Sequence, residues 1–433
     1  MRDKKRTLES REDNPINVMN GASWNQESLW HFASSRGVDR RTFLRLLAAG
    51  GAAAVLAACG VDPAMPDAHS GSTDPGTPPP ASRPWFKDPE PFILRDDKGL
   101  EARLENLHGL ITPNRLFFVR NNSVSLDVDA ADWTLSVEGD AISDPIELTY
   151  EDIKNLPTRT LFAYLECAGN HRAMFDLVNG RQASGTQWMT GAVGNGEWLG
   201  ASLRDILTTA GIRDNAHSVL LVGLDTESPE GGFRYSLPVE KAMHPDTLLA
   251  YSLNGETLPR DHGFPVRALV PGWVGSANIK WLGRIVVSSE PLWTRNNTTS
   301  YVLIGDQYPV EGESLGTPAT VQVIKSALAL PWPAQFPPGQ HRIHGFAHSP
   351  HGEITRVEWS ANAGATWFNA DLSGHQPPRS WARFEFIWDA RAGDHVLMTR
   401  AHDIAGNTQP DAVPFNEKGY LFNQPLPHPI HVV

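Results

Sequence analysis

The chain has 433 residues, 40% of them hydrophobic and 20% charged, which suits two globular domains, or one large domain plus a small one. Its formal net charge of −12 argues against nucleic acid as a partner, because phosphate backbones bind basic surfaces. The two cysteines, Cys59 and Cys167, are too few for a disulfide framework and lie in no C-x-x-C motif, which argues against thiolate zinc sites and covalently attached haem.

The first 59 residues read as a polar leader followed by an export signal. Arg40 and Arg41 lie in the run D-R-R-T-F-L-R, directly before an Ala-rich apolar stretch over residues 46–58. This pattern is typical of twin-arginine signals and predicts a periplasmic or other extracytoplasmic protein; a basic turn before a buried helix is the alternative. No apolar run reaches the roughly 18 residues of a membrane-spanning helix.

Cys59 ends the run L-A-A-C, which is typical of a lipoprotein cleavage box. An acylated Cys59 would anchor the mature protein to a membrane, whereas a signal-peptidase site beside an unmodified cysteine is the other interpretation. Residues 60–90 are rich in Pro, Gly and Ser and have too little apolar content to fold, so they predict a solvated linker.

Residues 91–311 are predicted to form a mixed domain with an α+β fold. Short apolar runs bounded by turn residues predict strands, and the stretch Leu203–Thr209 predicts a helix between them. The strands are expected at Trp133–Val137, Leu161–Leu165, Ser218–Val222 and Arg284–Ser288.

Residues 312–433 show no helical pattern and are predicted to form an immunoglobulin-like β-sandwich. Apolar runs recur at roughly ten-residue spacing between turn clusters, which is typical of such sandwiches. The tail from residue 414 is rich in Pro and Asn and is expected to pack back onto the core. The strands are expected at Thr320–Ile324, Gln340–His348, Ile354–Ser360, Arg383–Trp388 and His395–Ala401.

The run Y-L-E-C-A-G-N-H-R over residues 164–172 places Cys167 at the end of an apolar strand, before two residues that can carry positive charge. A thiolate is a soft ligand that suits a transition metal, and nearby positive charge lowers its pKa. A lone buried cysteine is nevertheless more often inert, so this run alone leaves both interpretations open.

Three further runs accompany the cysteine: F-F-V-R-N-N at 117–122, D-H-G-F-P-V-R at 261–267, and V-P-G-W-V-G-S-A-N-I-K-W at 270–281. Together with C-A-G-N-x-R they resemble the signature of the sulfite oxidase family of molybdopterin-dependent enzymes. The resemblance extends over roughly residues 100–433 and implies a mixed molybdopterin domain followed by a sandwich domain that mediates dimerisation.

The resemblance implies that Cys167 binds the molybdenum. Arg120 and Arg172 match arginines of the oxyanion pocket, and a guanidinium fork suits an oxyanion because it offers paired donors. Without the motifs, each arginine would be read as a surface ion pair. Tyr301 matches a tyrosine beside the metal, and Lys418 stands in the run N-E-K-G-Y-L-F-N where the family has a third arginine.

Other matching positions are implied to bind the molybdopterin. A dianionic phosphate requires cations and backbone N–H groups, which the motifs at 261–281 supply. For Asp225, a turn-capping role is an equal alternative. The implied cofactor-binding residues are Phe118, Asn121, Asn122, Asp225, His262, Arg267, Asn278, Ile279 and Lys280.

The family's activity implies oxidation of sulfite to sulfate, with electrons passed to an external acceptor such as a c-type cytochrome. One alternative is another sulfur compound, as in sulfane dehydrogenases or sulfoxide reductases. Sulfane dehydrogenases of the family tend to have C-S-G-N where this chain has C-A-G-N, which favours sulfite. The other alternative is a lipid-anchored binding or scaffold protein without the metal.

Overall fold

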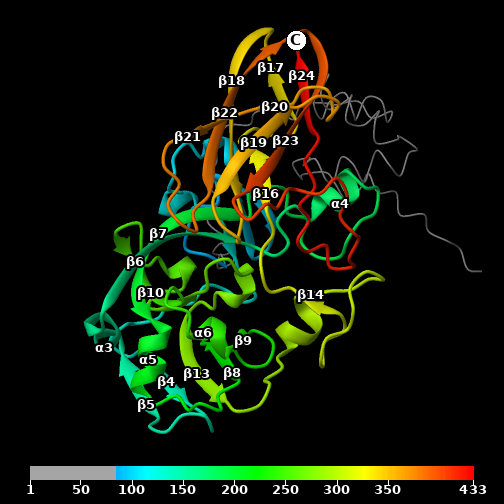
Figure 1. The fold of residues 1–433 in the computed structure, drawn as a ribbon. Helices are drawn as coiled ribbons and strands as arrows, with labels where there is room; N and C mark the ends of the chain where they lie inside the picture. The colour runs from blue at the N-terminus through cyan, green and yellow to red at the C-terminus, as the bar shows by residue number, and fades with distance from the viewer. Residues whose placement is uncertain (1–83) are drawn as a thin grey trace, which may run out of the picture. The chain divides into compact units, whose positions relative to one another are not determined.

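The computed structural model describes residues 84–433 (Figure 1). The predicted twin-arginine signal and the predicted lipid anchor at Cys59 lie outside the described residues. Within residues 84–433, no helix is long and apolar enough to span a membrane. The described chain consists of mixed sheets with few short helices, which confirms the predicted α+β class.

The first large sheet carries the strand that ends at Cys167. Its strand order is β11-β10-β7-β6, with β12 also paired to β10, and every pairing is antiparallel. The predicted strand at 161–165 lies within β6. The strands are β6 (Thr158–Glu166), β7 (Val193–Ser202), β10 (Leu248–Leu253), β11 (Glu256–Thr257) and β12 (Arg267–Leu269).

A second five-stranded sheet has the order β5-β4-β13-β8-β9, with β4 and β13 parallel. Leu135 and Val137 of β4 are buried while their neighbours are not, as expected for a strand with one face turned toward a core. The helix α5 (Leu203–Thr209) and residues of both sheets share one apolar core. The strands are β4 (Thr134–Glu138), β5 (Ile146–Thr149), β8 (Ser218–Gly223), β9 (Arg234–Pro238) and β13 (Leu282–Ser288).

Short elements complete this part of the chain. The three-stranded sheet β1-β2-β3 brings Arg120 to the site, and a Thr149–Asp152 capping box starts α3. These elements are β1 (Phe92–Asp96), β2 (Gly99–Ala102), β3 (Val119–Arg120), β14 (Val302–Leu303), β15 (Thr317–Pro318), α3 (Tyr150–Asn155), α4 (Ala173–Leu177), α6 (Val239–Ala242), η2 (Leu104–Asn106), η3 (Asn114–Leu116), η4 (Arg260–His262), η5 (Gly275–Ala277) and η6 (Asn296–Ser300).

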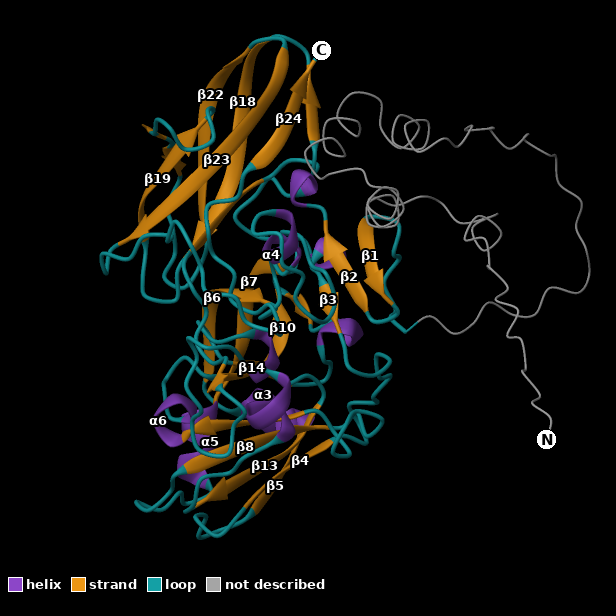
Figure 2. Cartoon of the chain, turned by 90° about the vertical axis from the view of Figure 1, so that its right-hand side faces the viewer, coloured by secondary structure: helices purple, strands orange, loops and turns teal. Residues whose placement is uncertain are grey.

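The C-terminal residues form two β-sheets around their own apolar core (Figure 2). In β22, Phe384, Phe386 and Trp388 alternate with more exposed residues, as expected for one face turned toward a core. The sheet orders are β16-β18-β22-β21 and β17-β24-β23-β19-β20. The strands are β16 (Lys325–Leu328), β17 (Ala334–Phe336), β18 (Gly339–His348), β19 (Ile354–Ser360), β20 (Phe368–Asn369), β21 (Asp371–Ser373), β22 (Ala382–Ala390), β23 (Gly393–Asp403) and β24 (His428–Val432).

One predicted strand is wrong. Thr320–Ile324 forms no strand, and β16 begins only at Lys325. The backbone of this segment bonds to loops of the first half instead: the Thr320 carbonyl accepts from Val274 N, and Gln322 N donates to the Gly272 carbonyl. Tertiary contacts therefore override the strand propensity of these residues.

The two halves of the described chain share buried contacts. Tyr164 N in β6 donates to the Arg379 carbonyl of the sandwich at 3.1 Å. Tyr164 also lies in a small apolar cluster with Phe346 and Trp381. The sandwich therefore packs directly against the strand that leads to Cys167.

Candidate active site

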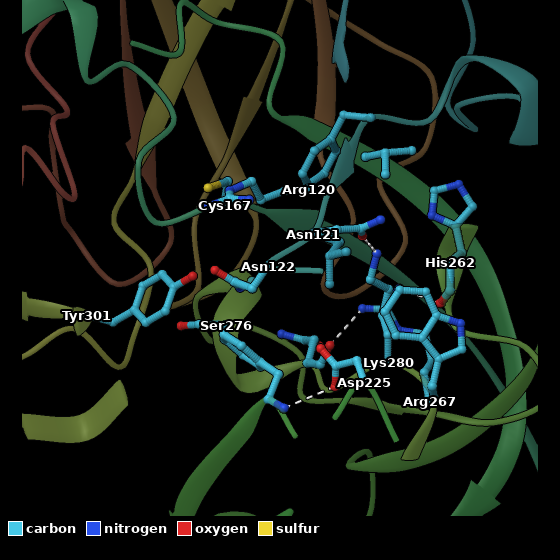
Figure 3. A pocket seen from close by; sticks show the side chains of 17 residues that line it. Arg120, Asn121, Asn122, Cys167, Asp225, His262, Arg267, Ser276, Lys280 and Tyr301 are labelled. Carbon is cyan, nitrogen blue, oxygen red and sulfur yellow. Dashed lines mark hydrogen bonds between the residues drawn. The ribbon is translucent and has the colours of Figure 1, made fainter. Parts of the chain in front are cut away.

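A pocket lined by residues of β3, β6, β12 and the loop between β8 and β9 gathers most of the predicted site residues (Figure 3). It encloses about 700 Å³, including its opening to solvent. Cys167 and Tyr301 lie toward one end, and His262, Arg267 and Lys280 toward the other. The predicted residues that line it are Phe118, Arg120, Asn121, Asn122, Cys167, Asp225, His262, Arg267, Asn278, Lys280 and Tyr301.

Cys167 follows β6 directly and is fixed by its backbone. Its N–H donates to the Ala192 carbonyl at 2.9 Å, and its own carbonyl accepts from Asn170 N at 2.9 Å, which turns the chain sharply. Burial raises the pKa of the Cys167 thiol, while Arg172 and Arg120 act in the opposite direction. A cysteine in this position can be held as a thiolate by a metal cation.

Arg172 lies beside this loop in a narrow slot. Its Nε donates to the Lys418 carbonyl and its Nη1 to the Thr186 carbonyl, each at 2.7 Å. A Cβ added at Gly169 would lie 2.6 Å from Nη2 of Arg172, and one at Gly185 would lie 2.8 Å from Nη1. Any larger residue in place of Gly169 would therefore displace the guanidinium of Arg172.

Lys418 contributes its main-chain carbonyl to this slot. Its side chain is half-buried and is not among the side chains that line the pocket. The side chain of Arg172 does not line the pocket either, although its guanidinium carbon lies 4.9 Å from the centroid of the Tyr420 ring. Of the three predicted oxyanion-binding side chains, Arg120 is thus the one that lines the pocket.

Tyr301 closes the thiol end of the pocket. Its ring stacks on Tyr420 with centroids 5.5 Å apart. Burial raises the pKa of Tyr301, with Arg120 opposing the shift. The hydroxyl is therefore protonated at neutral pH and can donate a hydrogen bond to an oxyanion.

The other end of the pocket is cationic. Arg267 donates to the His262 carbonyl at 3.0 Å and to the Asn278 carbonyl at 2.9 Å. Lys280 Nζ donates to the Asp261 carbonyl at 2.9 Å and to the Asn121 side chain. Burial lowers the pKa of Arg267 to about 9 and that of Lys280 to about 7. An anion bound here would stabilise both cations.

The remaining predicted residues play more local parts. Asp225 accepts from Ser228 Oγ and from Phe233 N, so its carboxylate orders its own loop at the pocket edge. Asn278 accepts from Val270 N at 2.7 Å and donates to the Val274 carbonyl at 3.0 Å. Ile279 is packed in the apolar core and is not among the lining side chains.

Ser276 was not predicted, although it lies within the run V-G-S-A-N-I-K. It lines the pocket, is 7% exposed, and its hydroxyl has no hydrogen-bond partner among the described residues. A buried hydroxyl normally finds a partner, so Ser276 indicates a polar ligand at this position. The sequence could have indicated Ser276, because it lies within the motif at 270–281, just before Asn278.

These features fit the cofactor that the motifs imply. A soft thiol lies toward one end, buried cations lie toward the other, and the Ser276 hydroxyl lacks a partner among the described residues. A metal bound to an organic group that ends in a phosphate meets all three requirements. Cys167 would hold the metal, and His262, Arg267 and Lys280 would hold the phosphate.

A second feature that was not predicted lies behind Cys167. Glu166 is fully buried and forms an ion pair with Lys325 of β16, with Nζ and Oε1 2.7 Å apart. Asn170 Nδ2 donates to the same oxygen at 2.9 Å. The residue that precedes the thiol is therefore tied to the sandwich by a buried charge pair.

Comparisons with known proteins agree with these features. Residues 121–295 match the family described as oxidoreductase molybdopterin binding domain, and residues 318–431 the one described as Mo-co oxidoreductase dimerisation domain. Sulfite oxidase of Gallus gallus is 34% identical over 380 residues, covering 83% of this chain and 80% of its own. Mitochondrial sulfite oxidase of Mus musculus is 33% identical over 81% of this chain, which spans 64% of that relative's length. The solved sulfane dehydrogenase SoxCD from Paracoccus pantotrophus is similar, with a TM-score of 0.68, 29% identity, and coverage of 77% of this chain and 86% of its own.

Proposed function

Since the chain belongs to the sulfite oxidase family of molybdenum-cofactor oxidoreductases, we propose that it oxidises sulfite to sulfate and passes two electrons to an external acceptor. The observation that carries this proposal is the position of Arg120 and Tyr301 beside Cys167 in one pocket. A guanidinium and a neutral phenol together suit a small oxyanion placed next to a thiolate-bound metal.

The bound cofactor supplies the two-electron redox chemistry and the oxygen atom that the substrate receives. The protein positions the reactants. Arg120 attracts and orients the oxyanion, and Tyr301 donates a hydrogen bond to it. Arg172 adds positive charge close to Cys167, while its own donors stay fixed on the carbonyls of Lys418 and Thr186.

In the overall reaction, sulfite and water give sulfate, two protons and two electrons. Water therefore replaces the oxygen atom that the cofactor has given to the substrate. We propose a c-type cytochrome as the electron acceptor, because a chain with a net charge of −12 favours a basic partner. We also propose a homodimer formed through the sandwich, which is supported by the dimerisation-domain match of residues 318–431.

A sulfane dehydrogenase is the second candidate, and it is supported by the similarity to SoxCD. Ala168 is the residue that separates the two candidates. It is fully buried in an apolar cluster with Val274 and Leu303, where a serine hydroxyl would be costly without a partner. The C-A-G-N loop therefore favours sulfite over a sulfane.

The test is sulfite-dependent reduction of ferricyanide by molybdenum-loaded protein, with Cys167→Ser as the control. We expect turnover that is lost in the variant. Full molybdenum content without sulfite oxidation would reject the substrate, and Lys418→Arg and sulfane substrates would then be tried. Absence of molybdenum and pterin would instead favour a metal-free scaffold protein.

We further propose that the protein is exported by the twin-arginine route and is lipidated at Cys59. Replacing Arg40 and Arg41 by lysine should retain the protein in the cytoplasm, as cell fractionation would show. Cys59→Ala should release exported protein from the membrane fraction. Exported protein that stays membrane-bound in this variant would contradict lipidation at Cys59.

A further inference from the structure

The described chain begins with a short segment that packs against the cationic end of the pocket. We call residues 84–88 the strap. The N–H groups of Phe86 and Lys87 donate to the Asp261 carboxylate, at 3.0 and 2.8 Å. Asp261 directly precedes His262 in the short helix η4, so the strap is bonded to the turn that carries a pocket residue.

Further contacts fix the strap. Ser125 N donates to the Pro84 carbonyl at 2.8 Å, and Ser125 Oγ donates to Asp261. Trp85 is buried in a small apolar cluster with Phe92, Leu100 and Val119. The strap thus has both polar and apolar contacts with the catalytic part of the chain.

The side chain of Lys87 is not among those that line the pocket, but it contacts His262, which is. Its Nζ lies 2.6 Å from the Phe117 carbonyl and 2.6 Å from Nε2 of His262, a side chain that lines the pocket. Burial lowers the pKa of Lys87 to about 7, although Asp261 acts against this shift. An ammonium group has three donors, and these two contacts use two of them.

Positive charge is in excess at this end of the pocket. Lys87, Arg267 and Lys280 are all largely buried, and Lys87 and Lys280 both contact the short segment 261–262. Two acids lie near them. The Asp261 carboxylate already accepts from two strap amides and a hydroxyl, and the Asp225 carboxylate accepts from Ser228 Oγ and Phe233 N. Since burial lowers the pKa of each of these groups, an anionic ligand at this end would stabilise their charged forms.

We propose that Lys87 is a further ligand of the cofactor's phosphate, so that docking of the strap and binding of the cofactor strengthen each other. The inference rests on the molybdenum cofactor of the proposed function and not on sulfite as the substrate. It follows that the strap remains docked most firmly when the cofactor is present, because the phosphate holds Lys87 from the pocket side.

The first test measures cofactor retention without turnover. Wild type, Lys87→Met and Lys87→Arg are loaded, dialysed, and assayed for molybdenum and pterin per chain over time. We expect Lys87→Met to lose cofactor about tenfold to a hundredfold faster, as for removal of a hydrogen bond to a charged group. Lys87→Arg should lose it more slowly than Lys87→Met. Lys154→Met is the matched control, because Lys154 forms an exposed ion pair with Glu151 at 3.0 Å and neither residue lines the pocket.

The second test uses metal-free protein with inorganic phosphate as the probe. Chymotrypsin cleavage at Phe86, which is 45% exposed, requires the strap to leave its site. Phosphate should slow cleavage several-fold in the wild type and have little effect in Lys87→Met. Lys87→Gln serves the same purpose if the methionine variant does not fold.

Two results together would overturn the proposal. Lys87→Met would retain the cofactor as well as the wild type does, and its strap would be cleaved faster than in the wild type but would still be protected by phosphate. Lys87 would then only fasten the strap to the Phe117 carbonyl. Both readouts are independent of turnover. A protein that keeps its cofactor but does not oxidise sulfite therefore refutes the substrate and leaves the role of Lys87 standing.

Discussion

Replacing Lys325 by methionine is expected to destabilise the protein strongly. The side chains of Lys325 and Glu166 are 2% and 0% exposed, and their charged atoms lie 2.7 Å apart. Methionine keeps most of the aliphatic volume but leaves the Glu166 carboxylate buried without its cation, which costs about 3–5 kcal/mol. Because Asn170 still donates to the carboxylate, we expect a loss near the lower end, about 3 kcal/mol.

The assay is urea unfolding of the metal-free protein, followed by tryptophan fluorescence. Glu166→Gln in the Lys325→Met background should recover part of the loss, because an amide carries no charge; this coupling is measured by a double-mutant cycle. The matched control is Arg284→Met, which breaks an exposed 3.5 Å pair with Glu138 and should cost less than about 1 kcal/mol. A Lys325→Met protein as stable as this control, with no coupling to Glu166→Gln, would refute the reasoning.

Three further predictions concern the site and the sandwich. Gly169→Ala should lower kcat/KM for sulfite by about tenfold to a hundredfold in ferricyanide assays, because the new Cβ displaces Arg172; unchanged kinetics would exclude the slot as a requirement. Arg120→Lys keeps the charge but loses the paired donors, so KM for sulfite should rise by about tenfold, whereas an unchanged KM would remove Arg120 from the substrate site. Burial lowers the pKa of His428 to about 4, so the unfolded chain binds a proton between about pH 6.5 and pH 4 that the folded chain does not. His428 alone should therefore lower the free energy of unfolding by up to about 3 kcal/mol between about pH 6.5 and pH 4. Urea titrations of His428→Asn should show a smaller decrease in this free energy over the same range.

Two elements were predicted at the bounds that the structure gives them. The predicted strand Ile354–Ser360 coincides with β19, and the predicted helix Leu203–Thr209 coincides with α5. In α5 the buried residues Leu203, Ile206 and Leu207 follow helical spacing. In β19 every third residue is buried, and the pairing with β23 has a register shift between Ile354 and Arg356. The strand β24 was missed because Pro429 and the polar tail argue against a strand, yet its backbone pairs with β23 and with β17.

Residues in distinctive motifs were found more readily than residues that act through distant contacts. Cys167, Arg120 and His262 come from separate runs and line one pocket, as the resemblance implied. Lys87 and Lys325 carry no local signal, because each meets its partner only after the chain has folded across more than 150 residues. Such buried charge contacts depend on tertiary geometry that no window of sequence contains.

The contacts around Arg172 also determine at which point of protein synthesis the site can be completed. Its Nε acceptor is the Lys418 carbonyl, and the neighbouring Leu421 N–H donates to the Ala168 carbonyl at 3.0 Å. A nascent polypeptide therefore has no complete site until residues 418–421 have left the ribosome, however early the pocket itself folds. A premature stop codon just upstream of residue 418 would accordingly yield protein in which Arg172 lacks its Nε acceptor.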